Sequence, residues 1–145
     1  MLFHRHSFTV AAVALSLSVF ATGCETKVSQ CNKLIKVANA ATTELQSMGQ
    51  NKNPDKLAQM NQVASSLDKY AKEVQGIELK DEKLQGFQKR LSTLYGNTRD
   101  HSLTLIEAGK KKDAPGMQAA LKKMMSGTQE EGAIVTELNS YCQAK

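Results

Sequence analysis

The stretch from Leu84 to Ala108 reads LQGFQKRLSTLYGNTRDHSLTLIEA and decides the fold class. Apolar side chains recur in it at alternating steps of three and four residues, which is the spacing of one face of an α-helix. Three further segments repeat this spacing, and no strand-like alternation competes anywhere in the chain. The apolar seams are, in chain order, Cys31, Leu34, Ala38, Ala41, Leu45 and Met48; Leu57, Met60, Ala64, Leu67, Ala71 and Val74; Leu84, Phe87, Leu91, Leu94, Thr98, His101, Leu105 and Ala108; and Met117, Leu121, Met124, Thr128, Glu131, Val135, Leu138 and Cys142. The sequence therefore predicts an all-α protein with four helices.

Capping and breaking residues separate these segments. Asn53 with Pro54, and Asp113 with Pro115, have the pattern of an N-cap followed by a proline in the first helical turn. Gly109 is expected to end the third helix. Because the connections are short, the four helices are expected to form an up-down-up-down bundle over residues 31–145.

The first 23 residues have the features of a secretory signal peptide. A basic start is followed by an apolar run from Phe8 to Phe20 and then by small residues. About 13 apolar residues are too few to span a bilayer comfortably, so a retained anchor helix is the weaker interpretation. We expect residues 1–23 to be removed.

The end of this leader, Ala21-Thr22-Gly23-Cys24, resembles the lipobox of bacterial lipoproteins. The resemblance implies that Cys24 receives a diacylglyceryl group through its sulfur, that the leader is cut before it, and that the new amino group is acylated. Several acyl chains give stable membrane attachment. Residues 24–30 would then form a short lipid-anchored linker, with the domain in the periplasm or another exported compartment. Glu25 is not the Asp that resembles an inner-membrane retention signal in enteric bacteria, so cell membrane and outer membrane both stay open.

Two cysteines remain beside Cys24. Export permits Cys31 and Cys142 to be oxidised. They lie near the start of the first helix and the end of the fourth, which an up-down-up-down bundle places at the same end. We expect one disulfide between them, the alternative being two buried free thiols.

The formal net charge is +5, and removing the leader takes away Arg5 and no acidic residue. Such a mild excess, with few aromatic residues, argues against a nucleic-acid role. At the end expected to face away from the membrane, the turns carry the lysines of a candidate binding tip, Lys52, Lys110, Lys111 and Lys112. This tip would suit an acidic partner or an anionic polymer. The alternative is a solvated end whose lysines complement helix dipoles.

His101 is the only histidine outside the leader, and antiparallel pairing of the last two helices would bring it near Met124. Imidazole and thioether together suit copper(I) or haem iron. The alternative is that both side chains only fill the core.

Polar residues also occupy the inferred seams at mid-height, namely Thr98, Thr128 and Glu131. They are expected either to form a buried network with Tyr95 or His101, or to face water. A buried Glu131 would have acid–base potential, and a polar layer that sets helix register is the alternative.

Sequence signatures of enzymes are missing, and so are paired histidines for zinc. The sequence predicts a noncatalytic protein-binding or assembly module at a bacterial membrane, without a cofactor. A copper or haem carrier using His101 and Met124 is the alternative. In its anchor and bundle alone, the chain is similar to the cyanobacterial PsbQ-like lipoproteins that attach to photosystem II, and fold by itself does not define function.

Overall fold

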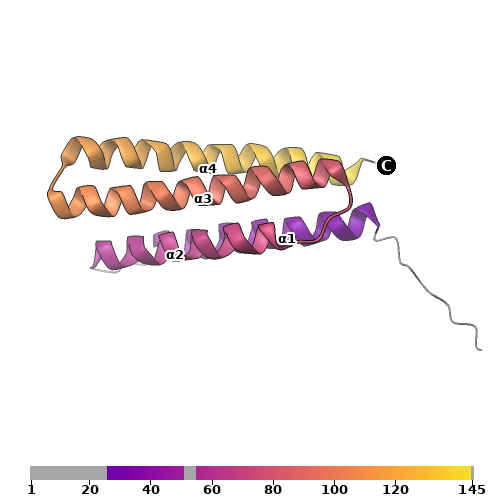
Figure 1. The fold of residues 1–145 in the computed structure, drawn as a ribbon, viewed down its shortest axis with the longest axis horizontal. Helices are drawn as coiled ribbons and strands as arrows, with labels where there is room; N and C mark the ends of the chain where they lie inside the picture. Colours follow the sequence, from indigo (N-terminus) through magenta and orange to yellow (C-terminus); the bar gives the residue numbers. More distant parts are fainter. Residues whose placement is uncertain (1–25, 51–54, 145) are drawn as a thin grey trace, which may run out of the picture.

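The computed structural model describes residues 26–50 and 55–144, which form four helices (Figure 1). They are α1 (Lys27–Gln50), α2 (Lys56–Gln75), α3 (Glu82–Lys111) and α4 (Ala114–Gln143). No strand occurs in this part of the chain. The all-α class and the four-helix bundle are confirmed.

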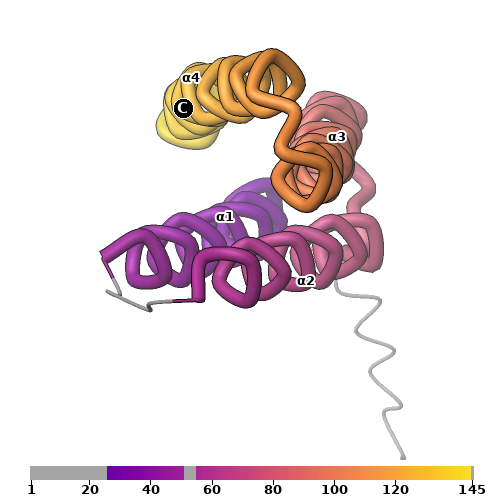
Figure 2. Tube along the Cα trace, turned by 90° about the vertical axis from the view of Figure 1, so that its left-hand side faces the viewer, coloured from indigo at the N-terminus to yellow at the C-terminus, as the bar shows by residue number. Residues whose placement is uncertain are grey.

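The helices run alternately up and down (Figure 1). The start of α1, the α2–α3 connection and the end of α4 lie together at what we call the closed end. The connections α1–α2 and α3–α4 lie at the opposite, open end. Seen from the open end, α1 and α4 diverge toward the viewer, while α3 stays beside both α2 and α4 (Figure 2).

Aspartate side chains cap three of the helices. Asp81 accepts a hydrogen bond from the Leu84 backbone N–H, and Asp113 does the same for Gly116 N–H. Asp55 caps α2. The residues expected to open this helix, Asn53 and Pro54, lie outside the described residues. The aspartates satisfy backbone donors that the first helical turn leaves without partners.

Two helix boundaries differ from the sequence-based expectation. Helix α3 continues through Gly109 to Lys111, and the left-handed residue that ends it is Lys112, with φ 55°. Its backbone N–H bonds to the Gly109 carbonyl, so helical hydrogen bonding persists beyond the glycine. Helix α1 begins at Lys27, inside the segment 24–30 that was expected to be a linker.

The main core lies in the closed half. Residues from all four helices are fully buried there, namely Leu34, Val74, Leu84, Leu91, Ile134 and Leu138. Phe87 packs near Tyr141, with 6.2 Å between ring centroids. Removing this apolar surface from water is the main driving force for folding.

The predicted seam of α4 is right in its second half and wrong in its first. Leu138 is buried, but Met117 and Leu121 are exposed, and Thr128 is exposed as well. The physical reason is the divergence of α1 from α4, which leaves the first half of α4 packed on α3 but not on α1 (Figure 2). One face of that half therefore has no fourth helix to cover it.

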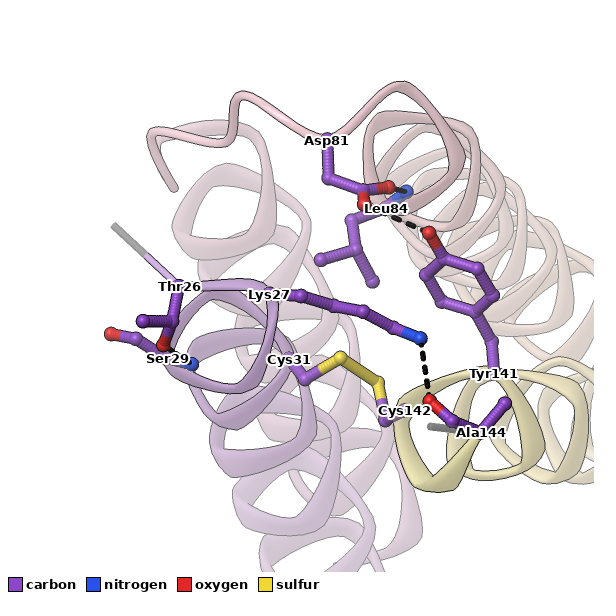
Figure 3. The surroundings of a disulfide bond; sticks show 9 residues. All are labelled: Thr26, Lys27, Ser29, Cys31, Asp81, Leu84, Tyr141, Cys142 and Ala144. Carbon is purple, nitrogen blue, oxygen red and sulfur yellow. Dashed lines mark hydrogen bonds between the residues drawn. A yellow bond between two sulfur atoms is a disulfide. The ribbon is translucent and has the colours of Figure 1, made fainter. Parts of the chain in front are cut away.

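The closed end is held by a covalent bond and by polar contacts (Figure 3). Cys31 and Cys142 form the expected disulfide, with Cα atoms 5.9 Å apart. The Tyr141 hydroxyl donates to Asp81 over 2.8 Å, and Lys27 Nζ donates to the Ala144 carbonyl over 3.0 Å. These contacts join the start of α1 and the end of α4 to each other and to the α2–α3 connection.

The Gln30 side chain strengthens the same junction. Its Oε1 accepts hydrogen bonds from the backbone N–H groups of Lys80, at 2.6 Å, and Asp81, at 3.0 Å. Helix α1 is thereby fixed to the start of α3.

The leader, Cys24 and Lys52 lie outside the described residues. Within the described residues, no helix is long and apolar enough to cross a membrane.

Candidate binding groove

An apolar groove opens between α1, α2 and α4 in the open half. Its volume is about 430 Å³. Apolar side chains from three helices line it, and they are Leu45, Met60, Val63, Leu67, Leu121, Met124 and Met125. Leu121 is 46% exposed and Met125 is 68% exposed, so both are accessible from water. We call this feature the apolar groove.

Methionines are concentrated around the apolar groove. All five methionines of the described residues, Met48, Met60, Met117, Met124 and Met125, lie in the open half, while Phe87 and Tyr141 lie in the closed half. Methionine is unbranched and polarisable, and it adapts to ligands of different shape. The groove lining is therefore of a kind that suits binding.

Lysines surround the open end. Lys110 pairs with Glu107 at 2.8 Å. Among the described residues, Lys111, Lys112, Lys122 and Lys123 form no ion pair. Lys122 also lines a shallow pocket together with Leu121 and Met125, so positive charge lies directly beside the apolar groove. The expected lysine tip thus extends onto α4.

Charges elsewhere in the described chain are more often neutralised. Arg90 pairs with Glu137 at 2.6 Å, and Arg99 pairs with Asp68 at 2.7 Å. What distinguishes the open end is a cluster of neighbouring lysines without an ion pair, Lys111, Lys112, Lys122 and Lys123.

A polar layer crosses the bundle between its two halves. The Tyr70 hydroxyl donates to Glu44 over 2.5 Å, and the Tyr95 hydroxyl donates to Glu131 over 2.8 Å. The two tyrosine rings lie 6.5 Å apart at an angle of 57°. Glu131 also accepts from the Thr42 hydroxyl at 3.3 Å, which links α1, α3 and α4.

Glu44 is held in its charged form by this layer. Hydrogen bonds from Ser66 and then Tyr70 lower its pKa from 4.5 to about 2. Burial, followed by the negative charge of Glu131, raises the pKa of Tyr95. The hydrogen bond to Glu44, and then burial, raise the pKa of Tyr70 as well, so both tyrosine hydroxyls stay neutral at ordinary pH.

Of the polar seam residues Thr98, His101, Thr128 and Glu131, only Glu131 joins this layer. Thr128 instead donates to the Met124 carbonyl of its own helix at 3.3 Å. Thr98 lies against Gly127, where an added Cβ would stand 2.8 Å from the Thr98 hydroxyl oxygen. Gly127 thus permits close approach of α3 and α4.

His101 and Met124 line different grooves. His101 lines a groove formed by α3 and α4 alone, together with Lys122 and Lys123. Met124 lines the apolar groove, and its sulfur lies 3.8 Å from the Ser102 hydroxyl. The described residues contain no group of three or more His, Cys, Asp or Glu side chains arranged to hold a metal ion.

Sequence reasoning missed Glu44 and the apolar groove. Glu44 follows Thr43 and precedes the seam residue Leu45, so helical spacing assigns it to the flank of α1. A usable signal was the concentration of methionines in segments 48–60 and 117–125. The divergence of α1 from α4 has no counterpart in apolar spacing.

Comparisons with protein-family models, with curated proteins and with solved structures find no match for this chain.

Proposed function

We propose that this protein is a lipid-anchored, noncatalytic binding module at a bacterial membrane, exported to the periplasm or an equivalent compartment. The observation that carries the proposal is the apolar groove with its lysine rim at the open end. In a bundle tied at its other end, this is the surface with both apolar area and excess charge to offer a protein partner.

The position of the expected lipid attachment site supports this orientation. Only Glu25 and Thr26 separate Cys24 from the start of α1 in the sequence. A lipid on Cys24 would hold the closed end near the bilayer. Helix α3 has 30 residues and is about 45 Å long. In an upright bundle, the apolar groove would lie well clear of the membrane surface.

The anchor is tested by intact-mass spectrometry of the protein extracted from its own host's membranes. We expect loss of residues 1–23, a lipid adduct on Cys24, and a Cys24→Ala variant that no longer fractionates with membranes. An unlipidated chain that retains its leader would overturn the localisation.

The binding role is tested with a photo-crosslinking amino acid at position 121, inside the apolar groove. Position 103 is the matched control, because Leu103 is 44% exposed and Leu121 is 46% exposed. We expect a defined protein adduct from position 121 and none from position 103. Equal adducts from both positions, or none from either, would contradict a dedicated binding surface.

A further inference from the structure

We infer that the apolar groove takes a partner protein's amphipathic helix, whose apolar face enters the groove and whose flanks carry acidic residues. This inference rests on the proposed function and adds the chemistry of the partner. Three independent features of the described residues carry it: the dimensions of the groove, the kind of side chain that lines it, and the charge around it.

The groove has the length of a short helix. On α4 its lining runs from Leu121 to Thr128, which is about 10 Å along the helix axis. Helices α1 and α2 form the opposite wall through Leu45, Met60 and Val63. About two turns of a helix fit such a trough, and ligands of this kind insert apolar side chains at positions i, i+3 or i+4, and i+7.

The lining favours an apolar helix face over a polar or small ligand. Met60, Met124 and Met125 contribute long side chains without a strong hydrogen-bond donor or acceptor. Thioether side chains repack around bulky aliphatic or aromatic groups. A helical ligand can therefore bury its apolar residues here without placing them against charged groups.

The lysines around the apolar groove favour a ligand with negative charge. Lys122 lies beside the apolar groove on α4, Lys123 follows it on the same helix, and Lys111 and Lys112 lie at the end of α3, all without an ion pair among the described residues. Acidic residues flanking the ligand's apolar face would neutralise them, whereas a second copy of this chain would bring two lysine rims together. Complementary charge speeds association and excludes partners of like charge.

The test uses the full chain, produced with its leader and labelled with ¹³C at the methionine methyl groups. If it is lipidated, it is studied in lipid nanodiscs. The probe is an 18-residue helical peptide with a leucine face and glutamate flanks. One control peptide has the same composition in scrambled order, and another replaces each glutamate by lysine. The methyl resonances of Met60, Met124 and Met125 report occupation of the apolar groove.

We expect the acidic amphipathic peptide to shift these three resonances in a saturable manner, and both control peptides to bind at least about tenfold more weakly. Leu121→Glu should weaken binding by at least about tenfold, whereas Leu103→Glu, on the far face of α3, should leave it unchanged. Both positions are exposed, so neither change threatens the fold.

Four results would overturn the inference: equal binding of the acidic and lysine peptides, no binding of any peptide, shifts caused instead by vesicles of phosphatidylglycerol, or shifts caused by raising the protein concentration alone. The last two would assign the groove to a lipid surface or to a second copy. Because these measurements do not depend on a lipid at Cys24 or on a cellular partner, a failure here is distinguishable from failure of the proposed function.

Discussion

The two ends of the bundle differ in how completely they bury the apolar side chains of their helices. At the closed end, four helices, a disulfide and the contacts of Asp81 and Gln30 enclose an apolar core. At the open end, α1 diverges from α4, and Met117, Met125 and Leu121 are exposed. A single amphipathic helix, α4, thus buries its apolar residues along one half and leaves apolar residues accessible along the other.

The largest expected effect comes from removing the disulfide with Cys31→Ala and Cys142→Ala together. The bond joins residues 111 positions apart, and in the chain-entropy model its loss costs roughly 4 to 5 kcal/mol. We expect the melting temperature, followed by circular dichroism, to fall by about 15–20 °C.

Reductant supplies the control for this prediction. It should lower the melting temperature of the parent chain by a similar amount and leave the double variant unaffected. An unchanged melting temperature in the double variant would mean that the closed end does not depend on its covalent bond.

A matched pair of leucine truncations compares the two halves of α4 directly. Leu138 is 0% exposed and Leu121 is 46% exposed. Leu138→Ala should lower the free energy of unfolding by about 3 kcal/mol, because it leaves a cavity in the core. Leu121→Ala should change it by less than about 0.5 kcal/mol. Denaturant unfolding measures both, and equal losses would show that Leu121 is covered in solution.

A pair of glycine substitutions sharpens the comparison at the α3–α4 interface. An added Cβ at Gly96 meets nothing within 4 Å, whereas at Gly127 it stands 2.8 Å from the Thr98 hydroxyl. Gly96→Ala should raise the free energy of unfolding by about 0.5–1 kcal/mol, since glycine disfavours a helix interior. Gly127→Ala should raise the free energy of unfolding by less, because the Thr98 side chain must move to make room for the new Cβ. A larger gain at Gly127 than at Gly96 would refute close approach of the helices there.

The smallest effect concerns acid stability at the boundary between the halves. The pKa of Glu44 is lowered from 4.5 to about 2, so its contribution to stability is complete above pH 4.5 and is lost as the pH falls toward 2. Glu44→Gln should reduce this loss, as measured by unfolding at several pH values. Glu78→Gln, exposed in the α2–α3 connection, is the control, and identical pH profiles for both variants and the parent would exclude the role assigned to Glu44.

Much of the fold follows from local patterns. Leu34, Val74, Leu84 and Leu138 are seam positions in the sequence and are buried in the structure. Asp113 caps α4 as expected, because N-capping involves only neighbouring residues. The pairing of Cys31 with Cys142 follows from the up-down-up-down topology, which brings both cysteines to the same end of the bundle.

Less of the candidate site could be predicted from the sequence. The lysines were visible as a run at residues 110–112, but Met117 and Leu121 were assigned to the core because helical spacing cannot tell a buried seam from an apolar face without a neighbour. The sequence leaves Glu131 either in a buried network with Tyr95 or His101 or facing water, and the structure shows a half-buried Glu131 that accepts from the Tyr95 hydroxyl. Its counterpart Glu44 was missed, because its partners Ser66 and Tyr70 come from another helix.

The helices, their caps, the alternation of their direction and the common end of Cys31 and Cys142 follow from the sequence, because periodicity, capping and short connections act between near neighbours. Tertiary packing sets three further features: the divergence of α1 from α4 toward the open end, the methionine lining of the space between them, and the polar layer of Tyr70 and Tyr95 with two glutamates. Those features depend on the angle at which packed helices cross, which the shapes of many distant side chains set together.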